Sequence, residues 1–259
     1  MPTDRPPVGF GPHDHSRAGN RRPVHCPGFQ RTLVFRPTGE ARHSGIVLWS
    51  EIFQITAPIR RTAAFFAGHG FIVAVPEVYH EFLPAGTVLA YDQAGADKGN
   101  ELKYAKELAS YDDDARAAVA YLKTHERGNG RVGALGICLG GHLAFRTAMQ
   151  PEVAATACFY ATDIHQGSLG QGKADNSLAR IPDIKGELMM IWGRQDPHVP
   201  GEGRARIYSA LTAAGTRFTW HEFNAAHAFL RDEGLRYDAE LAHLTLGMAV
   251  DLFRTKLGT

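Results

Sequence analysis

The fold is decided by the stretch Arg131-Val-Gly-Ala-Leu-Gly-Ile-Cys-Leu-Gly-Gly-His-Leu-Ala-Phe-Arg146. It begins as a short apolar run, passes through closely spaced glycines and continues as a segment typical of a helix. Within it, Gly136-x-Cys138-x-Gly140 has the form of a nucleophile elbow with cysteine where serine is usual. Such a turn needs small neighbours, because its nucleophile has a strained backbone and the strand and helix approach closely. We therefore predict a strand, a sharp turn at Cys138 and a helix.

The surroundings of Cys138 favour a reactive thiol. Gly140 and Gly141 open the next helix, so free N–H groups and the positive end of the helix dipole lie next to the sulfur. Such an environment favours a thiolate. A cysteine after a buried strand is more often a small apolar residue than a nucleophile, so the motif alone leaves both interpretations open.

Two later segments supply the partners that a nucleophile requires. Met189-Met-Ile-Trp192 is predicted as a buried strand, and the loop after it carries Asp196. Residues 218–223 are predicted as another strand, and the loop after it carries His227. Nucleophile, acid and base thus occur in the order Cys138, Asp196, His227, each just after a strand, which is the chain order of α/β-hydrolases.

Length and composition indicate an ordinary globular chain. The 259 residues are 44% hydrophobic and 21% charged, with a net charge of +1. We expect a single domain over residues 29–259. The balanced charge disfavours nucleic-acid and membrane partners. The three cysteines, Cys26, Cys138 and Cys158, have no framework spacing and suggest a reducing compartment.

The N-terminal residues 1–28 are expected to form a proline-rich arm without an element of their own. They contain no apolar run that a secretion signal needs, and no stretch of the chain approaches the roughly 20 apolar residues of a membrane span. A cytoplasmic protein is therefore expected. His13, His15, His25 and Cys26 fit no zinc-binding spacing, and no metal or cofactor is predicted.

Strands and helices alternate along the rest of the chain. Besides the strand and helix around Cys138, strands are predicted at 31–35, 44–49, 71–75, 154–160, 187–192 and 217–223. Helices are predicted at 58–68, 111–124, 203–214 and 237–256. Two long loops are expected, at 76 to about 100 and at 161–184, and loops of that length are usually functional or mobile. Asp112-Asp113-Asp114 is interpreted as the acidic start of the helix over 111–124, not as a metal site. The alternation predicts an α/β fold, a mostly parallel sheet with helices on both faces and no large lid domain. Ligands then bind beyond the carboxyl ends of the strands.

From about residue 31 to 256 the sequence resembles the dienelactone hydrolase family, cysteine-dependent members of the α/β-hydrolase fold. The resemblance rests on five patterns that occur in the right order. They are Glu51-Ile-Phe, Pro76-Glu-Val-Tyr79, Gly136-Ile-Cys138-Leu-Gly140-Gly, Gly193-Arg-Gln-Asp196-Pro-His-Val-Pro200 and Ala226-His227-Ala-Phe-Leu-Arg231.

The resemblance implies a hydrolase of small esters or lactones, as a monomer or homodimer. It also implies that Glu51 contacts the thiol of Cys138 and helps to hold or remove its proton. Without the resemblance, Glu51 is an acid at a strand end, more often solvated than catalytic. Because Glu51 and His227 are both bases near one thiol, which of them takes the proton first stays open.

The expected mechanism begins with attack of the Cys138 thiolate on an acyl carbon, which gives an acyl-enzyme. Backbone N–H groups of Leu139 and Ile52 are expected to stabilise the oxyanion. His227, held by Asp196, then moves protons and activates water for deacylation.

The residues expected to bind substrate depart from the family pattern. The family binds a substrate carboxylate with two arginines; Arg231 fills one position, whereas Glu81 stands where the other would be. Because like charges repel, we expect weak activity on dienelactone or a less anionic substrate. Tyr79 and Tyr160 are candidates to line the pocket, although as core or rim aromatics they need no such role. His142 and His198 are interpreted as structural or supporting residues.

Two other functions stay open. One is a broad-specificity carboxylesterase or thioesterase. The other is a binding protein that keeps the pocket without turnover, and the joint presence of Cys138, Asp196, His227 and Glu51 argues against it. A dehalogenase is disfavoured because it needs a carboxylate at the elbow.

Overall fold

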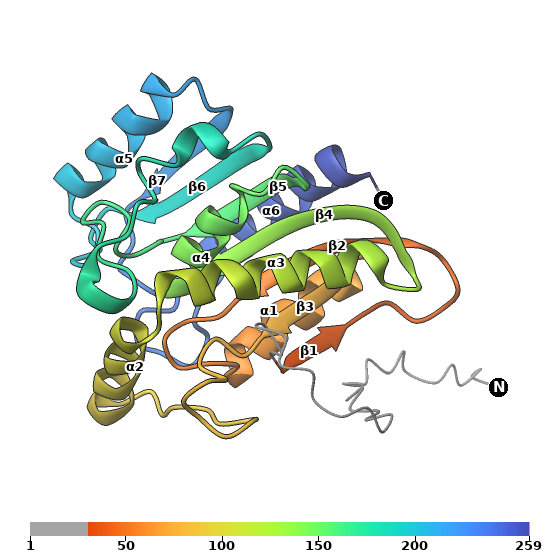
Figure 1. Cartoon of the computed structure of the whole chain (residues 1–259), viewed down its shortest axis with the longest axis horizontal. Coiled ribbons are helices and arrows are strands. Elements are labelled where there is room, and N and C mark those ends of the chain that lie inside the picture. The colour runs from red at the N-terminus through yellow and green to blue at the C-terminus, as the bar shows by residue number, and fades with distance from the viewer. Residues whose placement is uncertain (1–30, 259) are drawn as a thin grey trace.

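The computed structural model describes residues 31–258. The arm expected over residues 1–28, including its histidines and Cys26, lies outside the described residues. The described chain builds a seven-stranded sheet with helices around it (Figure 1). None of the helices within this range is long and apolar enough to cross a membrane.

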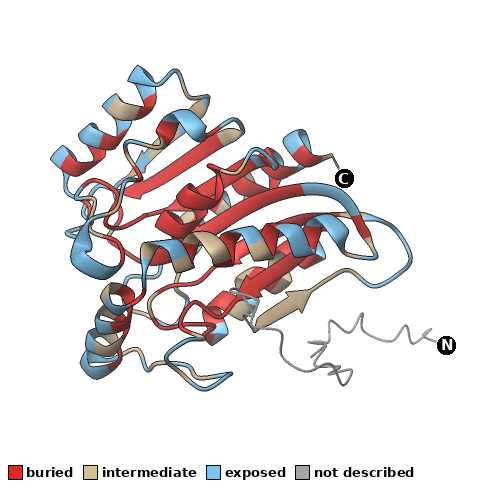
Figure 2. Ribbon diagram, viewed as in Figure 1, coloured by how far each residue is buried: buried red, intermediate tan, exposed pale blue. Residues whose placement is uncertain are grey.

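The sheet is parallel except at one edge, as the alternation of elements predicts. Its order is β1-β3-β2-β4-β5-β6-β7, and only β1 is antiparallel, against β3. The strands are β1 (Thr32–Phe35), β2 (His43–Trp49), β3 (Ile72–Pro76), β4 (Gly128–Ile137), β5 (Val153–Phe159), β6 (Glu187–Gly193) and β7 (Phe218–Phe223). Figure 2 shows the central strands almost entirely buried and the edge strand β1 half-buried. This burial on both faces explains the continuous apolar runs of the central strands.

Helices cover both faces of the sheet. They are α1 (Ala57–Gly68), α2 (Gln93–Ala105), α3 (Leu108–Thr124), α4 (Leu139–Thr147), α5 (Gly201–Ala213) and α6 (Ala239–Leu257). Two glycines in neighbouring strands let helices approach from opposite sides. A Cβ atom at Gly45 would lie 2.9 Å from Leu122 of α3, and one at Gly133 would lie 2.9 Å from Phe253 of α6. Phe253 also contacts Phe66 of α1, so α1 and α6 share a face.

The segment expected as the first long loop contains the helix α2, which corrects that expectation. Asp92 caps this helix by accepting a hydrogen bond from the Gly95 amide at 2.8 Å. The helix packs through glycines: a Cβ atom at Gly99 would lie 2.6 Å from the Ile52 carbonyl oxygen. A helix that packs its backbone against its neighbour needs no stripe of large apolar side chains. The apolar periodicity that identifies helices in a sequence is therefore missing.

The three adjacent acids do not start a helix, which corrects a second expectation. Helix α3 begins at Leu108, so these acids lie in its second turn. Asp112 receives both arms of the Arg146 guanidinium, at 2.9 and 2.7 Å. Asp114 accepts from Lys106 at 2.8 Å. Asp112 and Asp114 thus pair with cations outside α3, whereas Asp113 pairs with Arg116 of the same helix.

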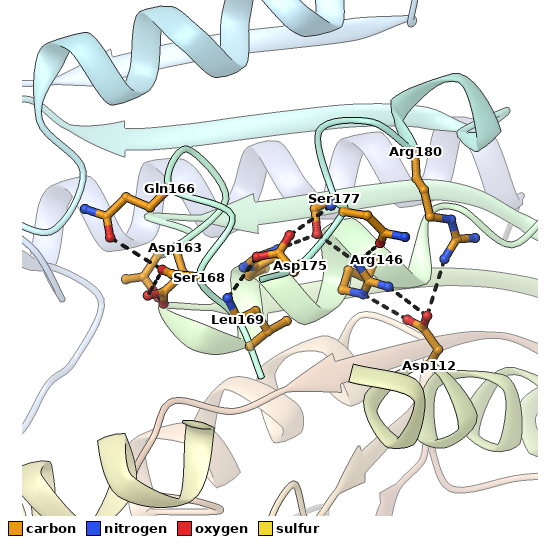
Figure 3. A network of polar contacts seen from close by, with 12 residues as sticks. Asp112, Arg146, Asp163, Gln166, Ser168, Leu169, Asp175, Ser177 and Arg180 are labelled. Atoms are coloured by element: carbon orange, nitrogen blue, oxygen red, sulfur yellow. Dashed lines mark hydrogen bonds and ion pairs between the residues drawn. The ribbon is translucent and has the colours of Figure 1, made fainter. Parts of the chain in front are cut away.

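The second long loop is fastened to helix α4. Figure 3 shows Arg146 of α4 between Asp112 and Ser177, and Ser177 accepts its hydrogen bond at 2.9 Å. One turn earlier on α4, His142 shares a 2.7 Å hydrogen bond with the same hydroxyl. Burial lowers the pKa of His142 to about 4, so this imidazole is neutral at physiological pH. His142 thus has the structural place that the sequence suggested.

Candidate active site

The sharp turn expected at Cys138 is present between β4 and α4. Cys138 has φ 61° and ψ −121°, a conformation that side chains rarely adopt. A Cβ atom at Gly136 would lie 1.8 Å from the carbonyl oxygen of Gly140, and one at Gly140 would lie 2.2 Å from that of Trp49. The small neighbours of the motif are therefore required by direct backbone contact.

Gly136→Ala is expected to lower the free energy of unfolding by about 3 kcal/mol or more, because the added methyl group overlaps the backbone. Gly247→Ala is the matched control, because nothing lies within 4 Å of its Cβ position in α6. It should cost no stability and gain up to about 1 kcal/mol of helix propensity. Equilibrium unfolding in urea measures both, and similar stabilities would contradict the close approach at the elbow.

Asp196 and His227 follow β6 and β7 and meet directly. His227 Nδ1 lies 2.7 Å from Asp196 Oδ2. The other carboxylate oxygen of Asp196 accepts from the His198 amide at 2.8 Å, which fixes the carboxylate plane. The Cys138 side chain lies close enough to His227 to raise the pKa of its imidazole. The three residues predicted from chain order are thus brought together.

The surroundings favour the protonated form of His227. Burial disfavours the imidazolium, but the charge of the Cys138 sulfur and the hydrogen bond to Asp196 outweigh it and raise the pKa of His227 to about 10. Burial opposes the charge of Asp196 as well, and the hydrogen bond with His227 outweighs it to lower the pKa of that carboxyl group. Both shifts support an imidazolium held between a carboxylate and the sulfur.

Two rings pack edge-on against His227. The ring centroid of Tyr160 lies 4.9 Å away and that of His198 lies 4.6 Å away. Tyr160 is fully buried and also contacts Phe229, so it supports His227 and does not line the cavity. His198 does line the cavity. Burial and the neighbouring His227 lower the pKa of His198, which makes it a neutral imidazole at physiological pH.

Glu51 lies just beyond β2 and lines the same cavity as Cys138. It is 3% exposed, and burial raises its pKa despite the opposing effects of Arg231 and Tyr91. Its Oε2 atom accepts a 2.9 Å hydrogen bond from the Tyr91 hydroxyl, which Thr56 shares at 2.6 Å. Among the described residues the hydrogen bond of Glu51 goes to Tyr91, and none to the Cys138 sulfur is present.

The two amides expected at the oxyanion site are available. Leu139 is the first residue of α4, and Ile52 lies in the turn after Glu51. Neither amide donates a backbone hydrogen bond within residues 31–258. Ile52 also lines the cavity.

The cavity has a volume of about 590 Å³ and is formed by α2 and by the segments that follow the six strands β2 to β7. Arg231 and Arg236 line it from the segment after β7. The Arg231 guanidinium stacks over the Tyr91 ring at 4.3 Å. Its buried Nε atom has no hydrogen-bond partner among the described residues. The positive charges of Arg231 and Arg236 on the cavity wall suit an anionic group of a ligand.

The structure places Glu81 outside this cavity, which corrects its expected part in substrate binding. Its carboxylate is bound by the Lys106 ammonium group and the Ser110 hydroxyl. Lys106 is fully buried and also pairs with Asp114. The expected repulsion between Glu81 and a substrate carboxylate therefore loses its structural basis.

Tyr79 also lies outside the cavity lining. It is fully buried, and its hydroxyl donates a 2.8 Å hydrogen bond to the Gly99 carbonyl. Its contribution is to hold α2 in place.

One group of side chains within residues 31–258 could in principle hold a metal ion: His80, Glu81 and Asp114. The Lys106 ammonium group contacts both carboxylates, so a cation of this protein already occupies the centre of the group. We assign no metal site there.

Several cavity residues had no signal in the sequence. Tyr91, Lys103, Asp163 and Arg236 all line the cavity. Tyr91 lies in the segment expected as a long functional or mobile loop over 76 to about 100, and Lys103 lies just beyond it, in a helix that was not predicted. Recognising Asp92 as a helix cap was the one route to α2 that the sequence offered.

Comparison with known proteins agrees with this architecture. The family model of the dienelactone hydrolase family matches residues 30–257. A Saccharomyces cerevisiae protein named "Putative carboxymethylenebutenolidase" is 41% identical over 84% of this chain and 82% of its own length. A carboxymethylenebutenolidase of Pseudomonas putida is 28% identical over 77% of this chain and 80% of its own. The crystal structure of a "Putative Dienelactone Hydrolase" from Klebsiella pneumoniae has the same fold, with a TM-score of 0.74 and 19% identity over 88% of this chain and 95% of its own. The chain therefore belongs to the dienelactone hydrolase family and is a hydrolase of the α/β-hydrolase fold.

Proposed function

We propose that this hydrolase cleaves small esters or lactones through an acyl-enzyme on Cys138. The observation that carries the proposal is the hydrogen bond between Asp196 and His227, beside Cys138 at the wall of the same cavity. A base held in this way next to a cysteine is the arrangement that nucleophilic catalysis requires.

In the first step the Cys138 sulfur bonds to the acyl carbon, and the carbonyl π electrons move to oxygen. The backbone N–H groups of Leu139 and Ile52 stabilise this oxyanion. The intermediate collapses as the carbon–oxygen single bond breaks, and the imidazolium of His227 gives its proton to the leaving alkoxide. In a lactone this alcohol stays tethered to the acyl group.

In the second step His227, now neutral, takes a proton from water, and the hydroxide attacks the thioester carbon. The carbon–sulfur bond breaks and returns the electron pair to Cys138. Asp196 keeps Nδ1 of His227 protonated throughout, so that Nε2 faces the sulfur. Glu51 supplies a second base in the same cavity, and its raised pKa suits proton exchange with the thiol.

The charges of the cavity support a substrate that carries a carboxylate. Arg231 and Arg236 line the cavity and supply the positive charge that a carboxylate would pair with. Glu81 is neutralised by Lys106 outside the cavity. The name of the relatives, carboxymethylenebutenolidase, denotes a lactone hydrolase and is consistent with this class.

The test combines turnover with trapping of the intermediate. We expect kcat/KM for an ester with a free terminal carboxylate to exceed that for its methyl-capped analogue by about tenfold or more, the scale of one charge-assisted hydrogen bond. Mass spectrometry of the rapidly quenched enzyme should find the acyl group on Cys138. Preference for the capped ester would favour a carboxylesterase that acts on neutral substrates. Absence of both turnover and adduct would favour a binding protein.

A further inference from the structure

We infer that the cavity face of α2 is a second recognition subsite, which selects substrates that carry a neutral hydroxyl or amide group on the far side of the scissile bond from the carboxylate. The inference rests on the proposed function and extends it to the part of the substrate that Arg231 does not bind.

The first observation is the spacing of the α2 residues that line the cavity. They are Gln93, Ala96, Asn100, Lys103 and Tyr104. Intervals of three and four residues place side chains on one face of a helix, so a whole face of α2 forms this wall. Figure 1 shows α2 as a separate helix set apart from the strands. The cavity side of α2 thus carries polar side chains beside the buried Gly95, Gly99 and Leu102.

Asn100 lies in the middle of this face and has a free carboxamide. The residue is half-buried, and none of the hydrogen bonds within residues 31–258 uses its side chain. A carboxamide offers two donors and an acceptor. Placed on a cavity wall, it can bind a hydroxyl or an amide as donor and acceptor at once.

The two buried charges on this side of the cavity, those of Lys103 and Asp163, neutralise each other. The Lys103 ammonium group lies 3.1 Å from both carboxylate oxygens of Asp163, and the pair is buried. Asp163 also accepts from Thr162 at 2.6 Å and from Ser168 at 3.2 Å. Its hydrogen-bonding capacity is filled, so neither an anion nor a cation finds an unpaired charge there.

The groups that remain near this pair are neutral. Figure 3 shows Gln166 on the loop beside Asp163 and Ser168, and Gln166 lines the cavity with Tyr104. The hydrogen bond from the Tyr104 hydroxyl to Asp163 is long, at 3.4 Å, so a ligand can replace it. Amide and hydroxyl groups therefore dominate this wall, in contrast to the arginines that the segment after β7 contributes to the cavity.

The wall lies close to the reacting atoms and is fixed. Gly99, the neighbour of Asn100, packs its backbone against Ile52, whose amide is a proposed oxyanion donor. The Tyr79 hydroxyl holds the Gly99 carbonyl at 2.8 Å. A group bound by Asn100 is thus positioned relative to the scissile bond, so its recognition contributes to kcat/KM.

The experiment uses two half-esters of succinate that differ in one group, the 2-hydroxyethyl ester and the propyl ester. Wild-type enzyme should prefer the hydroxylated ester. In Asn100→Leu, the ratio of kcat/KM for the hydroxylated ester to that for the propyl ester should fall about tenfold, the upper scale of a neutral hydrogen bond. Glu101→Gln is the control, because Glu101 is exposed on the other face and pairs only with Lys98 among the described residues. It should keep the wild-type ratio.

The outcomes separate this inference from the proposed function. If the wild type hydrolyses both esters and Asn100→Leu leaves their ratio unchanged, the subsite is wrong and the hydrolase stands. If Asn100→Leu loses activity on both esters equally, Asn100 supports the fold or the reaction and the subsite is again wrong. If the wild type hydrolyses neither ester and forms no adduct on Cys138, the proposed function is wrong. The subsite, which rests on that function, is then wrong as well.

Discussion

Cys138→Ala is expected to lower kcat/KM by at least about 10⁴-fold while the protein stays folded, because removal of a nucleophile eliminates the covalent route. Alanine keeps the Cβ atom and loses only the sulfur of a residue that is 9% exposed at the cavity wall. The strained backbone with φ 61° is the same for both residues, so the fold should survive. Hydrolysis rates and circular dichroism together measure the two halves of this result.

Cys158→Ala is the matched control, since it removes the other thiol of the described chain. Cys158 is fully buried in β5, and burial raises its pKa, which makes it unreactive. Its loss should leave turnover unchanged, and a thiol reagent should still label Cys138 in this variant. A Cys138→Ala enzyme with wild-type turnover would remove the proposed mechanism altogether.

Asp196→Asn is expected to lower kcat/KM by about 10³–10⁴-fold, through the tautomer of His227. The carboxylate accepts from His227 Nδ1 and from the His198 amide. In the variant the carbonyl oxygen can serve one of these donors, while the amide group faces the other position. With the oxygen on His198, the amide group points at Nδ1 and forces the proton to Nε2. His227 then cannot take a proton from the sulfur or from water.

Steady-state kinetics of Asp196→Asn beside Asp251→Asn test this effect. Asp251 is an exposed residue of α6, and its change should not affect turnover. The loss in Asp196→Asn should lie in kcat at least as much as in KM, since the interaction acts on proton transfer. A loss below about tenfold would mean that the contact between Asp196 and His227 has little part in the reaction.

The parallel sheet could be predicted from the sequence because its central strands are buried on both faces. Continuous apolar runs such as Ile46 to Trp49 can only be satisfied in that environment. The elbow was predictable for a related reason. A Cβ atom at either glycine would lie closer to a backbone atom than a methyl group can, so the packing itself requires the glycines of the motif.

The sequence failed at α2 and at the wall it forms. Helix prediction relies on a stripe of apolar residues, but α2 packs inward with Gly95 and Gly99 and turns polar residues to the cavity. Glu81 was misjudged for a similar reason. Its place in a family motif suggested substrate contact, whereas its partner Lys106 comes from the junction of α2 and α3, which no local pattern reveals.

The triad candidates and the α2 wall occupy different stretches of the chain, with Cys138, Asp196 and His227 all lying downstream of residue 105. The proposed α2 subsite thus lies in a different segment from the reacting groups, whereas Arg231 follows His227 in the same loop. Natural variation or laboratory evolution confined to positions such as Gln93 and Asn100 can retune which molecules are accepted while the reacting groups keep their alignment. Substitutions in the short helix α2 are therefore expected to change the range of substrates.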